Sequence, residues 1–183
     1  MNNENNFSQN IEQPEQWPKK ISVQFDQNHF DGQEIDKKAV DYQKDSGNSW
    51  LPGSLNNWWK KICLENEPEV SAEELGEIIY YLIEVARNAI EKVGSGEIEV
   101  IFDKNKITFV VTDQGVGFEN PLQQIKPKHG LYEVRGYADE FTIETNGKKY
   151  TKIPNSLNLD QSEETDVIQG SRITFTKNYD EKK

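Results

Sequence analysis

The chain has 183 residues, a formal net charge of −11 and a single cysteine, Cys63. This length predicts one domain, or one domain with an added segment. An acidic chain is repelled by phosphate backbones and anionic lipid surfaces, which argues against a nucleic-acid or membrane partner. One cysteine excludes an intrachain disulfide, and with only two histidines the chain lacks the ligands of an ordinary structural zinc site. Without a leader-like N-terminus or a run of about 20 apolar residues, we expect a cytoplasmic protein.

The first seventy residues divide into an arm and an extension. Residues 1–20 are rich in Asn, Gln and Glu and predict a disordered arm. Residues 21–70 predict an extension that packs on the core. Its three tryptophans carry more aromatic area than a free loop needs, so we expect them to pack on the main domain or on a partner. The expected elements are a strand at Ile21–Phe25 and helices at Asp31–Tyr42 and Asn56–Cys63, and the tryptophans are Trp50, Trp58 and Trp59.

Residues 71–178 carry sharper signals, followed by a tail at 179–183. Ser71 and Glu74 form a capping box ahead of apolar residues at helical spacing, and Gly94 ends that helix. The fold class predicted from the whole pattern is α+β, a two-layer sandwich with helices on one face of a mixed, mainly antiparallel sheet. The further elements expected are strands at Glu97–Phe102 and Ile107–Thr112, a loop at Glu119–Lys128, a helix at Leu131–Ala138, strands at Phe141–Thr145 and Arg172–Thr176, and an exposed loop at Asn155–Gly170.

Glu84 and Asn88 lie four residues apart on the long helix. Residues at this spacing share one helix face, and the apolar stripe predicts that this face is open to a ligand. A carboxylate can accept a proton from a water or a hydroxyl, and an amide oxygen suits Mg²⁺. The alternative is that both residues lie on an ordinary solvated helix face.

Asp113 follows a predicted strand, with Gly115 and Gly117 close behind it. The carboxylate can accept a hydrogen bond from an exocyclic amine such as that of adenine, and the glycines let backbone approach a base and ribose. The alternative is a turn after a strand, where Asp and Gly are common.

Two weaker signals concern phosphates. Gly130 and Leu131 open a predicted helix, whose first N–H groups could cradle phosphates, although an ordinary loop-to-helix junction has the same composition. Ser171 begins the last predicted strand and could place a hydroxyl nearby.

Taken in order, these motifs resemble the Bergerat fold, the ATP-binding fold of the gyrase, heat-shock chaperone, histidine kinase and mismatch-repair superfamily. The resemblance covers about Glu73 to Lys177 and rests on Glu84-x-x-x-Asn88-Ala89, Asp113-x-Gly115-x-Gly117, His129-Gly130-Leu131 and Gly170-Ser171. Tyr137–Glu144 also resembles the junction after the lid in small bacterial anti-sigma-factor serine kinases. The resemblance implies ATP and Mg²⁺ as cofactors. It makes Asn88 the Mg²⁺ ligand, Glu84 the candidate catalytic base and Asp113 the adenine reader. Gly115 and Gly117 would then line the base, and Gly130 would belong to the phosphate lid.

The function expected from the resemblance is that of an ATP-binding regulator of the anti-sigma or serine-kinase type, acting on a sigma-factor-like or antagonist-like protein partner. Lids of the family carry two or more glycines, whereas Leu131 follows Gly130 here. This departure leaves open a non-catalytic ATP-binding interaction module. The separate catalytic domain of a split histidine kinase and a homodimer also remain open.

Overall fold

The computed structural model describes residues 18–26, 54–66, 70–127 and 130–179. These residues form an α+β fold with one seven-stranded sheet in the order β1-β2-β3-β7-β4-β5-β6. Each of the six strand pairs between described residues is antiparallel, which confirms the mainly antiparallel sheet. The elements are β1 (Lys19–Asp26), α2 (Ser54–Asn66), α3 (Ala72–Val93), β2 (Ser95–Asp103), β3 (Lys106–Asp113), α4 (Pro121–Gln124), α5 (Gly130–Tyr137), β4 (Glu140–Thr145), β5 (Lys148–Lys152), β6 (Leu159–Glu164) and β7 (Ser171–Asn178).

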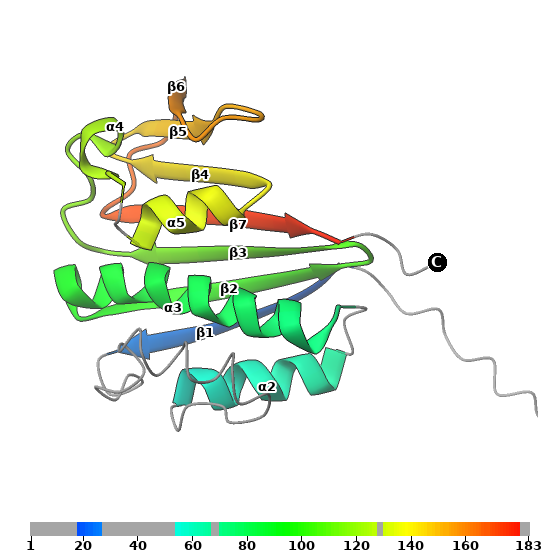
Figure 1. Ribbon diagram of the computed structural model, residues 1–183. Coiled ribbons are helices and arrows are strands. Elements are labelled where there is room, and N and C mark those ends of the chain that lie inside the picture. Colours follow the sequence, from blue (N-terminus) through cyan, green and yellow to red (C-terminus); the bar gives the residue numbers. More distant parts are fainter. Residues whose placement is uncertain (1–17, 27–53, 67–69, 128–129, 180–183) are drawn as a thin grey trace, which may run out of the picture.

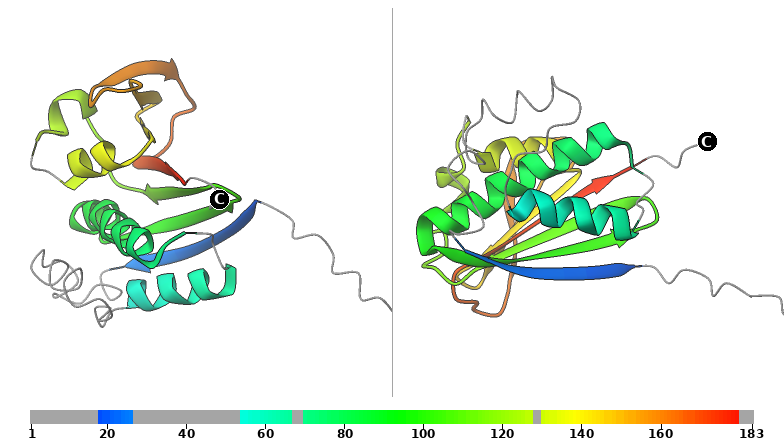
Figure 2. Two further views of the ribbon diagram at one scale, coloured as in Figure 1. Left: turned by 45° about the vertical axis from the view of Figure 1, so that its right-hand side comes forward. Right: turned by 90° about the horizontal axis from the view of Figure 1, so that it is seen from below.

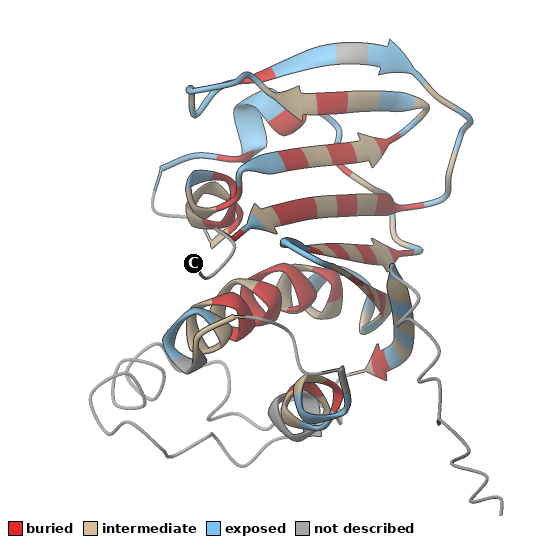
Figure 3. Ribbon diagram, turned by 90° about the vertical axis from the view of Figure 1, so that its right-hand side faces the viewer, coloured by how far each residue is buried: buried red, intermediate tan, exposed pale blue. Residues whose placement is uncertain are grey.

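The helices α2, α3 and α5 cover one face of the sheet (Figures 1 and 2). Burial alternates along the strands, as expected where one face meets helices and the other meets solvent (Figure 3). The core-facing rows are aromatic and β-branched, which suits strands packed against helices. None of the helices that the structure describes combines the length and apolar character needed to cross a bilayer.

The long helix α3 begins and ends as its sequence predicts. The Ser71 hydroxyl accepts from the Glu74 amide, and the Glu74 carboxylate accepts from the Ser71 amide, which completes the capping box. At the other end Gly94 has a φ of +86° and its amide donates to the Ile90 carbonyl, a left-handed cap that glycine adopts without strain. Both caps fix the length of α3. They therefore fix where along the sheet the polar residues of α3 lie relative to the strand ends.

The N-terminal extension is built into the domain. β1 forms the edge of the sheet beside β2, and it begins at Lys19, inside the segment predicted as a disordered arm. Trp59 of α2 is fully buried, and its ring lies against Phe102 and Phe109. The prediction that these tryptophans pack on the main domain is confirmed for Trp59 and, partly buried, for Trp58. Residues 1–17, Trp50 and the helix expected at Asp31–Tyr42 lie outside the described residues.

Two predicted loops contain regular structure. The segment 155–170, expected to be an exposed loop, includes the edge strand β6, which pairs with β5. Asn146 and Gly147 join β4 to β5 with φ values of 51° and 72°, the left-handed pair of a two-residue hairpin. The other correction is α4, a short helix that begins at Pro121 inside the expected loop, because proline suits the first turn of a helix.

Candidate functional site

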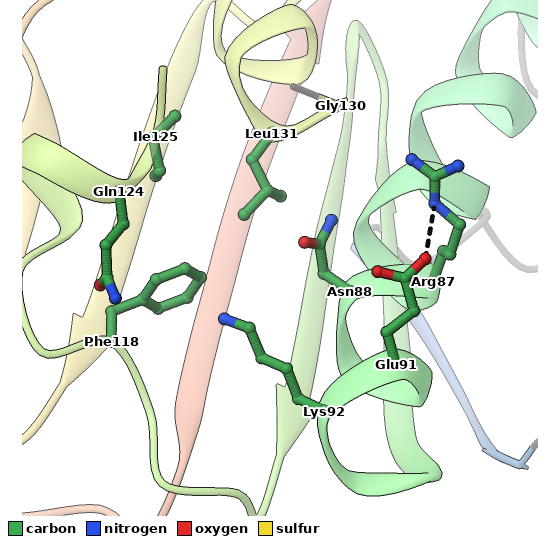
Figure 4. A pocket seen from close by; sticks show the side chains of 9 residues that line it. All are labelled: Arg87, Asn88, Glu91, Lys92, Phe118, Gln124, Ile125, Gly130 and Leu131. Carbon is green, nitrogen blue, oxygen red and sulfur yellow. Dashed lines mark ion pairs between the residues drawn. The ribbon is translucent and has the colours of Figure 1, made fainter. Parts of the chain in front are cut away.

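A cavity of about 250 Å³ lies between the C-terminal half of α3 on one side and Phe118, the end of α4 and the first residues of α5 on the other (Figure 4). Side chains from α3 form one wall, and those of the opposite side form the other. The lining residues are Arg87, Asn88, Glu91, Lys92, Phe118, Gln124, Ile125, Gly130 and Leu131.

Asn88 presents its amide oxygen to this cavity. Its Nδ2 donates to the main-chain carbonyl of Glu84 one turn earlier, at 2.8 Å. This hydrogen bond fixes the amide, so that Oδ1 points away from the helix and into the cavity (Figure 4). A neutral oxygen held in this way is a suitable ligand for a hard cation.

Two cations of α3 stand beside Asn88. The Lys92 ammonium lies 3.6 Å from the centre of the Phe118 ring. Burial lowers the pKa of Lys92, and the charges of Asp113 and Glu91 act in the opposite direction. Arg87 donates to Glu84 at 2.5 Å and forms an ion pair with Glu91 at 3.6 Å. Its Nε is buried and has no hydrogen-bond partner among the described residues. The cavity wall therefore holds two cations and one carboxylate, Glu91, and Arg87 is paired with both Glu84 and Glu91.

Glu84 does not lie on an open helix face, which corrects the expectation from the apolar stripe. The residue is 8% exposed. Its carboxylate receives the Arg87 hydrogen bond, and a Cβ built on Gly130 would lie 1.9 Å from Glu84 Oε2. The apolar stripe did not predict the burial of Glu84, because α3 is enclosed on more than one side. The sheet covers the apolar face of α3, and the start of α5 covers the side that carries Glu84.

Asp113 ends β3 in a buried row of polar side chains. In the sheet register it stands opposite Ser171 of β7, and Ser171 stands opposite Thr145 of β4. The Ser171 hydroxyl donates to one carboxylate oxygen of Asp113, and the Gly115 amide donates to the other at 2.9 Å. The Thr145 hydroxyl accepts from the Phe118 amide and donates to the Gly170 carbonyl. Ser171 is thus engaged with Asp113, whereas the sequence placed its hydroxyl near phosphates.

The glycines around this row are required by the protein's own packing. Gly117 has a φ of +72°, and a Cβ there would lie 2.2 Å from Thr145 Oγ1. Gly170 has a φ of +84°, and a Cβ there would lie 2.1 Å from the Asp113 carbonyl oxygen. A Cβ on Gly115 would lie 2.5 Å from Val93 Cγ2. These contacts hold three backbone segments close together around Asp113.

The predicted site residues therefore fall into two groups. Asn88, Gly130 and Leu131 line the cavity, whereas Asp113, Gly115, Gly117 and Ser171 form the polar cluster at the strand ends. Phe118 and Lys92 connect the two groups, because Phe118 follows Gly117 in the chain and the charge of Lys92 interacts with Asp113. His129 lies outside the described residues.

Sequence reasoning missed several members of the site. Lys92 lies one turn after Asn88 on α3, so the same four-residue spacing could have identified it. Arg87 precedes Asn88 directly. Thr145 had no such signal, because its role depends on the pairing of β4 with β7.

No cluster of three or more His, Cys, Asp or Glu side chains suited to a metal ion occurs in the described ranges. The amino-acid sequence matches no family model. A search of curated proteins likewise finds no match.

Proposed function

We propose that the protein binds Mg²⁺–ATP between α3 and the segment from Phe118 to Leu131, and that it acts as a regulatory module on a protein partner. In this proposal the α+β sandwich is a Bergerat ATP-binding fold. The observation that carries the proposal is the Asn88 amide oxygen facing a cavity whose wall also holds Lys92 and Arg87. An oxygen ligand beside Lys92 suits a metal–phosphate group, although the chain as a whole carries a net charge of −11. Arg87 would contact a phosphate by giving up one of its ion pairs to Glu84 and Glu91.

The donor set fits the cofactor. Mg²⁺ is commonly held by one or two protein oxygens together with phosphates and waters, so Asn88 suffices as the protein ligand. Bound Mg²⁺ would neutralise phosphate charge, and Lys92 would contact the phosphates directly. Asp113 accepts two hydrogen bonds within the protein, and a carboxylate offers about four acceptor positions. Its remaining acceptor positions suit the exocyclic amine of adenine, and because Asp113 is 6% exposed and lies outside the cavity lining, adenine would reach it only after the strand ends open.

The size of the cavity sets a condition on binding. Ligand pockets for drug-sized molecules enclose roughly 300–1,000 Å³, and this one encloses about 250 Å³. We therefore expect Phe118, α4 and the start of α5 to move away from α3 when a whole nucleotide enters. Leu131 and Ile125 would separate from Asn88 in that movement.

The position of Glu84 favours a binding module over a kinase. A general base must reach the proton it takes, and here the carboxylate is paired with Arg87 and covered by Gly130. A protein serine kinase is the second candidate, because Glu84 lies one turn before Asn88 and against the first residue of α5. In a kinase, outward movement of Gly130 would expose the carboxylate.

Calorimetry with Mg²⁺–ATP tests the binding proposal. We expect a dissociation constant between micromolar and millimolar, or about −8 to −4 kcal/mol. We expect ATP to bind about tenfold more weakly to each of three variants, because each loses one charge-assisted or metal contact. The variants are Asn88→Ala, Lys92→Met and Asp113→Asn. Asp160→Asn, an exposed carboxylate on β6, is the matched control and should leave binding unchanged. The absence of both heat and a thermal shift with wild-type protein would refute the proposal.

Transfer of radiolabelled phosphate from ATP separates the two candidates. Labelling of a co-purified protein that disappears in Glu84→Gln, but persists in the exposed control Glu140→Gln, would establish the kinase. ATP binding without transfer supports the module. Glu84→Gln should keep its ATP affinity in either case.

A further inference from the structure

Arg135 is a buried cation outside the candidate site. It lies on α5 one turn after Leu131, and only 6% of the residue is exposed. Lys152 at the end of β5 is close enough for the two positive charges to interact unfavourably. The Lys152 ammonium donates to the Ala138 carbonyl, which places it at the C-terminal end of the same helix. Neither residue lines the cavity beside Asn88.

Arg135 has no ion-pair partner among the residues that the structure describes. None of the hydrogen bonds or ion pairs found in the described part of the chain involves its guanidinium, and its Nε is buried without a partner. Its guanidinium lies over the Tyr132 ring, whose centre is 4.8 Å from Arg135 Cζ. Burial lowers the pKa of Arg135. An uncompensated buried charge is costly, and a second cation nearby adds to the cost. If Arg135 had only a structural role, an apolar side chain would fill its position at a lower cost in free energy.

Beside Asp139 and Lys177, whose charges also act on Lys152, this cation pair has exposed apolar neighbours. Leu157 and Ile153, which lie between β5 and β6, are 41% and 40% exposed. Leu157 lies over α5, because its Cδ2 would be 3.7 Å from a Cβ built on Gly136. Tyr132 and these two side chains therefore lie near Arg135 and Lys152. A free inorganic anion would gain nothing from such neighbours, whereas a peptide could bury its own apolar side chains against them.

We propose that Arg135 and Lys152 bind a carboxylate side chain of a peptide segment, with an apolar neighbour of that carboxylate packed on Ile153 and Leu157. A guanidinium matches the two oxygens of a carboxylate, and Arg at a desolvated position is a frequent binding hot spot. Asp139 is the carboxylate that acts on Lys152, and it also pairs with Lys177 at 3.4 Å. Three cations therefore share one carboxylate, and the ligand supplies a further negative charge. This site lies on the far side of α5 from α3, and it stands or falls independently of nucleotide binding.

Nuclear magnetic resonance of the full chain tests the proposal through the Arg135 Nε–Hε signal. The probes are acetyl-Leu-Glu-amide, its neutral match acetyl-Leu-Gln-amide, sodium acetate and inorganic phosphate, all at one ionic strength. We expect the Glu peptide to shift the signal saturably, and the Gln peptide to bind at least about tenfold more weakly. Acetate and phosphate should bind more weakly than the Glu peptide. Equal binding by phosphate would instead establish a small-oxyanion site and overturn the peptide assignment.

Two variants decide whether these residues form the site. Arg135→Met should weaken the Glu peptide at least about tenfold, whereas Arg172→Met, which removes a partly exposed arginine paired with Glu144, should not. Lys152→Gln should weaken binding by a smaller factor, and it provides the test if Arg135→Met does not fold. The proposal is overturned if Lys152→Gln and Arg135→Met both bind the Glu peptide with wild-type affinity. It is also overturned if Lys152→Gln keeps wild-type affinity and the wild-type protein does not prefer the Glu peptide to the Gln peptide. Calorimetry with Mg²⁺–ATP on the same variants should give wild-type values.

Discussion

The two ends of the sheet's core-facing side are built on different principles. Trp59, Phe102, Phe109 and Phe175 form an aromatic core in which every ring is fully buried and neighbouring rings lie 4.8–6.1 Å apart. Asp113, Ser171 and Thr145 form a polar row at the strand ends that is almost equally buried. The first is held by apolar contact, and the second by hydrogen bonds and closely packed backbone.

The aromatic core and the polar row therefore differ in how strictly they hold the positions of their side chains. Apolar packing tolerates small shifts of its members, because the energy depends mainly on area and volume. A buried polar row is stable only while each group keeps its partner, so it holds its geometry closely. The polar row thus holds the Asp113 carboxylate in one position more strictly than apolar packing would. The comparison makes four predictions, from the largest expected change in the free energy of unfolding to the smallest.

Trp59→Ala tests the aromatic core. Removal of this fully buried ring should lower the free energy of unfolding by about 3–5 kcal/mol, measured by urea denaturation followed by circular dichroism. Trp59→Phe should cost less, because it keeps a ring but loses the 3.2 Å hydrogen bond to the Leu75 carbonyl. Leu64→Ala on the same helix is the control, since Leu64 is 78% exposed. Equal effects of Trp59→Ala and Leu64→Ala would contradict the packing described here.

Gly170→Ala tests the backbone contacts of the polar row. The variant combines a left-handed φ with a contact to the Asp113 carbonyl oxygen, and we expect a cost of about 2–4 kcal/mol. Gly147→Ala provides a comparison at a similar positive φ, where the nearest atom is the terminal methyl of Val167. It should cost about 1–2 kcal/mol. If thermal unfolding gives the two variants the same stability, the backbone of the row is less tightly packed than the structure indicates.

Thr145→Val tests the hydrogen bonds of the row at nearly constant volume. Valine leaves the Phe118 amide without the acceptor at 2.9 Å, and an unsatisfied buried donor costs about 1–3 kcal/mol. Thr142→Val on the opposite face of the same strand should change stability by less than about 0.5 kcal/mol. Amide hydrogen exchange at Phe118 gives a second measurement, and faster exchange is expected only in Thr145→Val.

The comparison also explains how far the sequence could predict the structure. The ends of α3, the β2–β3 hairpin and the side of the sheet that faces the helices follow from caps and periodicity, which are local. β5 follows a local signal as well, because Asn146-Gly147 is a pair typical of a two-residue hairpin turn. β6 was missed because five of its six residues are polar or charged and because an edge strand needs few apolar residues.

The candidate site was predicted less completely, for a physical reason. The spacing of Glu84 and Asn88 fixed their shared helix face, but the burial of Glu84 depends on α5, whose position comes from tertiary packing. The row from Asp113 to Thr145 depends on the insertion of β7 between β3 and β4, a connection that local patterns do not encode. The Arg87 ion pair could have been proposed from its three-residue spacing to Glu84, but its effect on Glu84 required the structure.

Cys63 gives the smallest predicted effect at neutral pH, because its shifted pKa changes stability only above about pH 9, and it probes the edge of the aromatic core. The thiol packs against that core, and burial raises the pKa of Cys63 to about 12. Only the thiolate reacts with iodoacetamide, so native protein at pH 8 should be labelled far more slowly than protein in urea. Because the folded state favours the protonated thiol, its contribution to stability is complete below about pH 9 and is lost as the pH rises from 9 towards 12. The stability difference between wild type and Cys63→Ala should therefore shrink above pH 9. Equal labelling rates in native and unfolded protein would mean that α2 leaves the sheet readily, and the aromatic core would then be less firmly closed than the polar row.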